Sequence, residues 1–193
     1  MAKTPTKSDL SPQFKSREIT TPCKGQLEVT KSVYSHVSSL HGLINDWIKL
    51  REKGVRLCKG ITVLKLHECD SDYYPRELKS LMESLLQILD NLKSIIEGVS
   101  IINNRMQALA KLQPGNEATI STWSVSLISK YVKEIVEALE KEFKLKTIIT
   151  ENVAHCRDEK LIEVYVSAWE FEIYFDMKSY SYLFAEVGLT GLS

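Results

Sequence analysis

The stretch from Leu78 to Leu109 decides the fold, and it reads LKSLMESLLQILDNLKSIIEGVSIINNRMQAL. Apolar residues fill the a and d positions of each heptad along it: Leu78, Leu81, Leu85, Ile88, Leu92, Ile95, Val99, Ile102, Met106 and Leu109. This unbroken spacing predicts one long α-helix at about residues 76–112. At about 1.5 Å per residue such a helix reaches about 50 Å, which favours an elongated molecule.

The apolar face of this helix is wider than a two-stranded coiled coil needs. Met82, Leu89 and Ile96 add an e-position row beside the a and d seam, so we expect the helix to touch at least two other helices. Gly98 costs about 1 kcal/mol relative to Ala within a helix. We interpret it as a place of close approach or a mild bend.

Helical spacing continues on both sides of this segment. Upstream, a helix at about residues 26–53 is predicted from the apolar residues Val33, Val37, Leu40, Ile44, Trp47 and Ile48. We expect Gly54 to interrupt it, with a shorter helical piece at about residues 55–66. Downstream, the sequence QPGNEA is expected to reverse the chain, because Pro114 blocks helix continuation behind it and Gly115 favours a turn.

A third long helix is predicted at about residues 121–154, with Ser121 or Thr122 as its N-cap. Its apolar face carries Ile128, Tyr131, Val132, Ile135, Ala138, Leu139, Leu145 and Ile149. Its charged face carries the i, i+4 pairs Glu137–Lys141, Glu140–Lys144 and Glu142–Lys146, which predict a solvated surface. Glu142 and Asn152 also interrupt the apolar face, and we interpret them as residues that fix helix register.

The stretch AHCRDEKLIEVYVSAW, Ala154 to Trp169, places His155 beside Cys156. We interpret it as a corner between helices, because Asp158 suits the N-cap of a helix at about residues 158–170. The His155 imidazole is then expected to meet free carbonyls at the end of the preceding helix. A final short helix is placed at about residues 177–187. The helix after the corner is expected to present one apolar side: Leu161, Ile162, Tyr165, Val166 and Trp169.

A catalytic or metal site at this corner is the competing hypothesis. The sequence lacks a phosphate loop, a nucleophile elbow and a zinc-protease motif, so we expect neither an enzyme nor a cofactor. His67 and Cys69, together with His155 and Cys156, supply the atom types of a zinc site, but neighbours on one helix project apart. We expect the scattered cysteines to be reduced thiols: Cys23, Cys58, Cys69 and Cys156.

Composition argues against a strongly charged binding protein. The 193 residues include 25 Lys and Arg against 25 Asp and Glu, so no charge excess favours nucleic acid or a membrane surface. The sequence shows no apolar run long enough to span a bilayer and no secretory signal at its start. We therefore expect no membrane association, no direct nucleic-acid binding, and a location in the nucleus or the cytoplasm.

Residues 1–24 are predicted to form a disordered basic tail, because prolines and basic residues concentrate there. Thr4, Ser11 and Thr21 each precede a proline. The surroundings of Thr4 and Thr21 resemble the pattern that cyclin-dependent kinases prefer, so these three residues are candidate phosphorylation sites. Residues 25–193 are predicted to be a single all-α domain. We expect an elongated antiparallel helical bundle, built on a coiled-coil hairpin, with a shorter C-terminal helical segment.

Several stretches of the C-terminal third match the pattern of one family: Thr122-Trp123, the helix YVKEIVEALEKEFKLK, Ala154-His155, Asp158, Tyr165-x-Ser167-x-Trp169, Glu186 and Gly188. Weaker agreement lies earlier, at Asp46-Trp47, Ile48-Lys49 and Leu64-Lys65. These residues resemble the cyclin-dependent kinase 2-interacting protein family. The resemblance carries over no catalytic residue. It marks Trp123, His155, Tyr165 and Trp169 as candidates for packing or partner contact, and Trp47 and Leu92 join them as apolar candidates.

The resemblance implies a non-enzymatic, mainly nuclear adaptor that binds cell-cycle kinases, cyclin-dependent kinase 2 among them, in DNA replication and checkpoint signalling. It also implies a link to an assembly with AAA+ ATPases that acts in replisome protein turnover and in ribosome biogenesis, at the maturation of the large ribosomal subunit. Two other functions stay open: a homodimeric coiled-coil scaffold, and a helical bundle that holds a small ligand or metal. The scarcity of inward-facing polar residues favours the adaptor.

Overall fold

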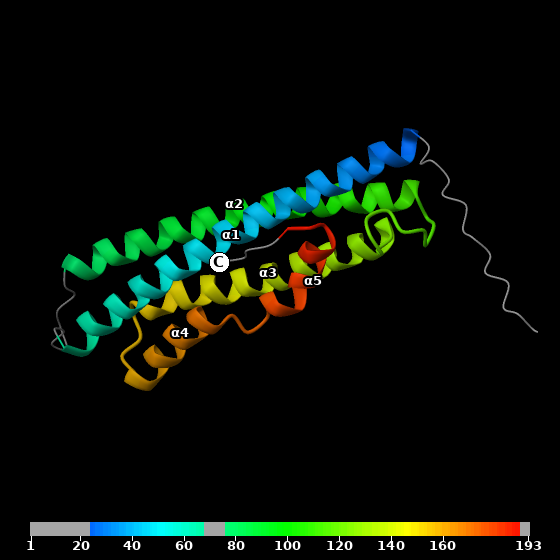
Figure 1. Cartoon of the computed structure of the whole chain (residues 1–193). Helices are drawn as coiled ribbons and strands as arrows, with labels where there is room; N and C mark the ends of the chain where they lie inside the picture. Colours follow the sequence, from blue (N-terminus) through cyan, green and yellow to red (C-terminus); the bar gives the residue numbers. More distant parts are fainter. Residues whose placement is uncertain (1–23, 68–75, 190–193) are drawn as a thin grey trace, which may run out of the picture.

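The computed structural model describes residues 24–67 and 76–189, and within these ranges it is all-α, as predicted. Its helices are α1 (Lys24–His67), α2 (Arg76–Leu112), α3 (Val125–Val153), α4 (Glu159–Phe171) and α5 (Met177–Glu186). The three long helices lie side by side along an elongated molecule (Figure 1). None of the helices in the described ranges combines the length and hydropathy needed to cross a bilayer. Thr4, Ser11 and Thr21 of the predicted tail lie outside the described residues.

The wide apolar face of α2 is covered from two sides by the chain itself. α2 packs against α1 and against α3 along its length, whereas α1 and α3 make few direct contacts with each other. Leu85, Leu92, Val99 and Met106 of the predicted seam are fully buried, and each such side chain contributes about 1.5–3 kcal/mol when removed from water. The prediction that this helix touches at least two others is confirmed.

α1 continues from Lys24 to His67 without interruption, so the predicted break at Gly54 is wrong. A glycine inside a helix costs only about 1 kcal/mol, and here it makes room for a neighbour. A Cβ at Gly54 would lie 2.3 Å from Nε1 of Trp169 in α4. Gly98 of α2 marks a second close approach, because its Cβ would lie 3.1 Å from Cδ1 of Leu43 in α1.

The connection from α2 to α3 is longer than the sequence indicates. The N-cap of α3 is Ser124, whose hydroxyl accepts a hydrogen bond from the Leu127 amide at 3.3 Å. The prediction that Ser121 or Thr122 caps this helix is therefore wrong. The reason is a tight turn, in which the Trp123 amide donates to the carbonyl of Ile120 at 2.9 Å and holds these residues outside the helix.

α4 and α5 lie along the side of the bundle where α1 and α3 leave a gap, and both contact these two helices (Figure 1). Asp158 caps α4, as predicted, and accepts hydrogen bonds from the amides of Lys160 and Leu161. Asp176 caps α5 in the same manner through the amide of Lys178. The C-terminal helices therefore complete the cross-section of the molecule.

Candidate protein-interaction site

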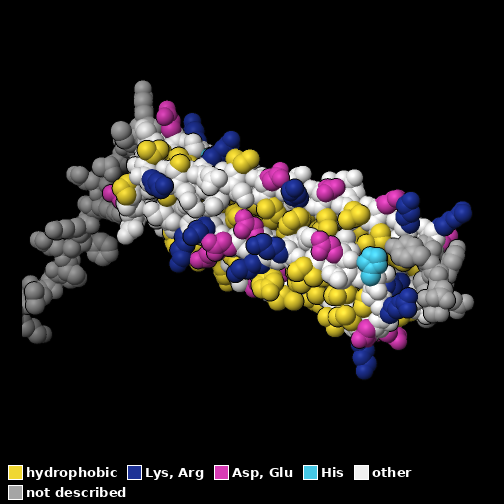
Figure 2. Space-filling model, turned by 180° about the vertical axis from the view of Figure 1, so that it is seen from behind, with side chains coloured by type: hydrophobic (Ala, Val, Ile, Leu, Met, Phe, Trp, Pro, Cys, Tyr) yellow, Lys and Arg dark blue, Asp and Glu magenta, His cyan; other side chains and the backbone are white. Residues whose placement is uncertain are grey.

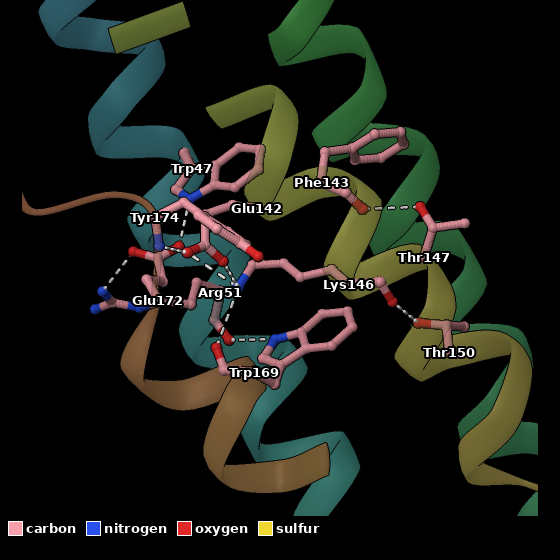
Figure 3. A network of polar contacts seen from close by, with 10 residues as sticks. All are labelled: Trp47, Arg51, Glu142, Phe143, Lys146, Thr147, Thr150, Trp169, Glu172 and Tyr174. Atoms are coloured by element: carbon pink, nitrogen blue, oxygen red, sulfur yellow. Dashed lines mark hydrogen bonds and ion pairs between the residues drawn. The ribbon is translucent and has the colours of Figure 1, made fainter. Parts of the chain in front are cut away.

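A cluster of four charged side chains lies where α4 ends, three of them buried and the fourth, Arg51, with 27% of its side chain exposed (Figure 3). Arg51 comes from α1, Glu142 and Lys146 come from α3, and Glu172 directly follows α4. The side chains of Glu142 and Lys146 are fully buried, and only 4% of the Glu172 side chain is exposed. Two positive and two negative groups balance each other, which is the condition for burying charges at acceptable cost.

Glu172 is the centre of this cluster. Its Oε1 accepts a hydrogen bond from Nε1 of Trp47 at 2.6 Å and lies 3.5 Å from Nζ of Lys146. Its Oε2 accepts from Nη1 of Arg51 at 3.1 Å. Lys146 also donates to the carbonyl oxygen of Trp169 at 3.1 Å. The charged residues thus tie the end of α4 to α1 and α3 at the same point.

Glu142 holds the segment that follows α4. One of its carboxylate oxygens accepts a hydrogen bond from the backbone amide of Tyr174. The other lies 3.7 Å from Nζ of Lys146 and has no hydrogen-bond partner in the described ranges. Burial raises the pKa of Glu142, against the opposing effects of the Tyr174 amide and Lys146. Burial also lowers the pKa of Lys146, against the attraction of Glu172 and Glu142.

The backbone at Glu172 turns the chain so that this side chain points inward. Its φ of 40° lies on the left-handed side, which residues other than glycine rarely adopt. The hydrogen bonds and ion pairs of its carboxylate offset this strain. As a result the neighbouring side chains, Phe171 on one side and Ile173 on the other, are left exposed.

The prediction that the Glu142–Lys146 pair is solvated is wrong. Both residues lie on the side of α3 that is covered by Trp169 and Glu172. Glu142 does interrupt the buried face, as predicted, because its side chain is fully buried. Asn152 does not interrupt that face, since it is exposed and its side chain donates to the carbonyl of Ile148 in its own helix.

The outer side of α4 carries apolar residues at heptad spacing, of which Ala168 is half-buried and the others are exposed. We call the following set the α4 apolar face: Leu161, Val164, Ala168 and Phe171 of α4, with Ile173 and Tyr174 after it. Val164 is 57% exposed and Phe171 is 76% exposed. Leu161 belongs to this outer side, so its predicted place beside Ile162 and Trp169 on the inner side is wrong. In Figure 2, hydrophobic side chains gather along the edge of the molecule at the end that carries α4.

The α4 apolar face is a surface suited to contact with another protein. Each exposed Å² of apolar surface costs about 25 cal/mol in water relative to a buried state, and contiguous exposed apolar patches mark interaction sites. Ile162 and Trp169 are buried on the opposite side of the helix. The packing of these two residues and the charge cluster therefore fix which side of α4 faces outward, and the face is presented on a rigid element.

The corner between α3 and α4 has the predicted position but a different capping residue. Nζ of Lys65 in α1 donates to the carbonyl oxygens of Val153 at 3.0 Å and Ala154 at 2.7 Å. The prediction that the His155 imidazole meets these carbonyls is therefore wrong: the ammonium group reaches them from α1, and His155 is exposed. Cys156 is half-buried, and its thiol contacts the carbonyl of Asp158 at 3.5 Å.

The hypothetical zinc site is only partly covered by the described residues. The side chain of His67 and the whole of Cys69 lie outside them, as does Cys23. Within the described ranges, no group of three His, Cys, Asp or Glu residues is arranged to hold a metal ion. Cys58 and Cys156 are free thiols there. Burial raises the pKa of Cys58 to about 12, so this thiol stays protonated at neutral pH.

The residues singled out in the sequence fall into different environments. Trp47, Leu92 and Trp169 are fully buried. Trp47 and Trp169 meet at the charge cluster, where the Trp169 indole donates to the carbonyl of Arg51 at 3.2 Å. Trp123 and Tyr165 are half-buried. The centroid of the Trp123 ring lies 4.7 Å from the centroid of the Tyr131 ring. Trp47, Leu92 and Trp169 therefore belong to the core, and Trp123 and Tyr165 stay candidates for packing or partner contact.

Sequence reasoning missed the residues that define the site, above all Lys146, Glu172 and Phe171. A signal for Lys146 was present, because it lies three residues before Ile149 and seven before Val153, in phase with the buried seam of α3. The spacing of Leu161, Val164, Ala168 and Phe171 was equally readable as a second apolar stripe.

The fold and the site define an all-helical protein-interaction subunit, and the comparisons with known proteins agree with this class. No protein-family model matches the chain. Proteins named cyclin-dependent kinase 2-interacting protein do match, and the chain is similar to them at 22% to 25% identity. The protein from Mus musculus is 25% identical over 195 residues, covering 86% of this chain and 92% of the relative. The human protein is 25% identical over 187 residues, covering 82% and 88%.

Two stretches that carry the family resemblance are in contact in the structure. The carboxylate of Glu186, near the end of α5, accepts hydrogen bonds from the Thr122 hydroxyl at 3.1 Å and from the Trp123 amide at 2.9 Å. Gly188, which also belongs to the resemblance, has a φ of 76°, a conformation that favours glycine. The Glu186 carboxylate therefore fastens α5 to the turn before α3.

Proposed function

We propose that this chain is a non-enzymatic adaptor that binds a cyclin-dependent kinase through the α4 apolar face. The relatives are named for their interaction with cyclin-dependent kinase 2, and they match most of this chain. The chain's own residues supply a surface suited to such binding. The observation that carries the proposal is the row of exposed apolar side chains on α4, held outward by the buried charge cluster.

The composition of this face supports binding to protein. Phe171 and Tyr174 are exposed aromatic residues beside the aliphatic Val164 and Ile173. Aromatic side chains contribute strongly to protein interfaces because they bury a large apolar area at a small cost in conformational entropy. The wide face of α2 is already covered by α1 and α3. We therefore assign partner binding to α4 and not to the wide face of α2.

The test uses a matched pair of valines. Val164 on α4 is 57% exposed and Val63 on α1 is 53% exposed, so the same substitution has a similar effect on stability at both positions. Purified cyclin-dependent kinase 2 is titrated onto the full chain and onto its Val164→Asp and Val63→Asp variants. The proposal predicts that Val164→Asp loses binding and Val63→Asp keeps it. A wild-type chain that does not bind the purified kinase, or two variants that bind equally, contradicts the proposal.

We also propose the finer assignments that the family resemblance implies. These are a mainly nuclear location, with the cytoplasm as a second one, a role in replication and checkpoint signalling, and a link to an AAA+ ATPase assembly in replisome protein turnover and large-ribosomal-subunit maturation. Fractionation of cells that carry the tagged chain tests the location. Mass spectrometry of the captured proteins tests the link. A chain absent from the nucleus, or a capture without an AAA+ ATPase, contradicts the respective assignment.

A further inference from the structure

α5 is held to the bundle differently from α4. Among the described helices it contacts α1 and α3, but neither α2 nor α4. Its side chains Leu183 and Phe184 are fully buried. The charge cluster holds the chain after α4 only as far as Tyr174, whose amide donates to Glu142. Because α4 does not rest on α5 in the described part of the chain, α5 can separate from the bundle without moving α4.

The C-terminal end of α5 is fastened at the surface by Glu186. Its carboxylate accepts a hydrogen bond from the Trp123 amide at 2.9 Å, and both of its oxygens lie 3.1 Å from the Thr122 hydroxyl. The Ser121 hydroxyl donates to the Glu186 carbonyl at 3.3 Å. We call these contacts the Glu186 anchor. Since Ser121 and Thr122 are exposed, water can replace these hydrogen bonds when α5 moves away.

The side of α1 that α5 covers carries polar atoms without partners. The His41 ring packs edge-on against the Phe184 ring of α5, with the ring centroids 5.1 Å apart. Ser38 and Asn45 lie one turn before and one turn after His41, on the same side of α1. Oγ of Ser38, Nε2 of His41 and Oδ1 of Asn45 are buried from water, and each lacks a hydrogen-bond partner in the described part of the chain. We call these three residues the α1 polar row.

The α1 polar row makes the contact with α5 less stable than an apolar contact would be. A buried polar group without a partner has lost its hydration and gained no hydrogen bond, and water restores that bond once the group is exposed. The charge cluster at the end of α4 has the opposite arrangement, because Glu172 there accepts from Trp47 and Arg51. The polar row therefore favours separation of α5, while the charge cluster keeps α4 in place.

We propose that α5 is a detachable cover, which separates from α1 and α3 as a unit while α1, α2, α3 and α4 stay folded. The chain bends between Tyr174, which is held by Glu142, and Met177, where α5 begins. Separation exposes the α1 polar row and the side of α3 that α5 contacts. This surface is distinct from the α4 apolar face, and the inference does not depend on kinase binding.

The experiment measures native-state amide hydrogen exchange of the full-length protein at several low concentrations of urea. The amides of residues 181–187 are expected to exchange through one common opening, faster than those of α2 and α4 and with a smaller dependence on urea. Protection that rises gradually from the ends of α5 would mean fraying, and it overturns the proposal. Exchange of α5 only together with α2 and α4 overturns it as well.

A pair of serine variants tests the α1 polar row. Ser38→Ala removes a buried hydroxyl without a partner, so the closed position gains stability and the α5 amides should exchange about tenfold more slowly. Ser39→Ala is the matched control, because Ser39 is exposed and its hydroxyl donates to the carbonyl of Ser35. α1 stays helical whether α5 is closed or open, so the control should leave the exchange of α5 unchanged. Equal exchange of α5 in the two variants overturns the proposal.

A pair of glutamate variants tests the Glu186 anchor. Glu186→Gln keeps the size of the side chain and removes its charge, which weakens the bonds from Thr122 and Trp123. The α5 amides should then exchange about tenfold faster, with α2 and α4 unchanged. Glu163→Gln, on the exposed side of α4, is the control and should leave α5 as in wild type. The proposal fails if Glu186→Gln does not accelerate α5, or if it accelerates α2 and α4 equally.

Discussion

Gly54 and Trp169 pack so closely that a Cβ on the glycine would lie 2.3 Å from Nε1 of the indole and 2.5 Å from two of its ring carbons. The same indole nitrogen donates to the carbonyl of Arg51 one turn earlier in α1. α4 is therefore seated on α1 at a position where any side chain would collide with a fully buried tryptophan. This contact lies beside the charge cluster, and both fix the orientation of α4.

Replacing Gly54 with alanine tests this seating. We expect Gly54→Ala to destabilise the protein by about 1–3 kcal/mol, because an added methyl group in a packed contact forces side chains and backbone to move. Gly42→Ala in the same helix is the control, since no atom lies within 4 Å of its Cβ. That change should stabilise the protein by about 0.5–1 kcal/mol. Urea denaturation measures both, and an equal gain in stability for the two variants would refute the close approach.

The buried lysine gives a second prediction. Lys146→Met removes the positive charge that faces Glu142 and Glu172 and leaves their carboxylates without this partner inside the protein. We expect a loss of about 3–5 kcal/mol, the usual cost of removing one partner of a buried ion pair. Lys144→Met, two residues earlier and exposed, should change stability by no more than about 0.5 kcal/mol. Similar free energies of unfolding for the two variants would argue that Lys146 is solvated.

The pH dependence of stability tests the environment of Glu142. Its pKa is raised above the ordinary 4.5, mainly by burial, so the folded protein holds the proton more strongly than the unfolded chain. The contribution of this group to stability is complete below the unfolded pKa and declines as pH rises through the folded pKa. The free energy of unfolding of wild type minus that of Glu142→Gln should therefore fall between acid and neutral pH. A difference that rises with pH would mean that the folded state favours the ionised carboxylate.

The long helix α2 was readable from local sequence because one strong signal determines it. The seam from Leu78 to Leu109 has an unbroken period, and its a and d residues are buried in the structure except Leu81 and Leu109, which are half-buried. The Asp158 cap was equally local, since a capping residue acts on amides two and three positions away. These features depend on neighbours within the same helix, which explains why no knowledge of the tertiary arrangement was needed.

The site depends on contacts between distant residues, and the sequence pattern does not contain them. Glu140–Lys144 and Glu142–Lys146 have the same spacing, yet only the second pair is covered by Trp169 and Glu172. Lys65, nearly 90 positions earlier in the chain, donates to the carbonyls at the end of α3. The local sequence pattern had indicated His155 for this role. An i, i+4 pair or a helix end does not reveal which distant element will lie against it.

The structure does not test the following two sequence-based predictions. Thr4, Ser11 and Thr21 lie outside the described residues and remain candidate phosphorylation sites. The predicted boundary between a tail and a single domain at residue 24 also remains a prediction. Phosphopeptide mapping after incubation of the full chain with a cyclin-dependent kinase would decide the first.

Amide hydrogen exchange of the full chain, with and without purified cyclin-dependent kinase 2, tests the central claim most directly. The claim is that the buried cluster around Glu172 turns the apolar side of α4 outward for a protein partner. The account predicts slower exchange on kinase binding at residues 159–175, with little change along α2. Slower exchange confined to α2 or to the N-terminal half of α1, or no change at any residue, would contradict it.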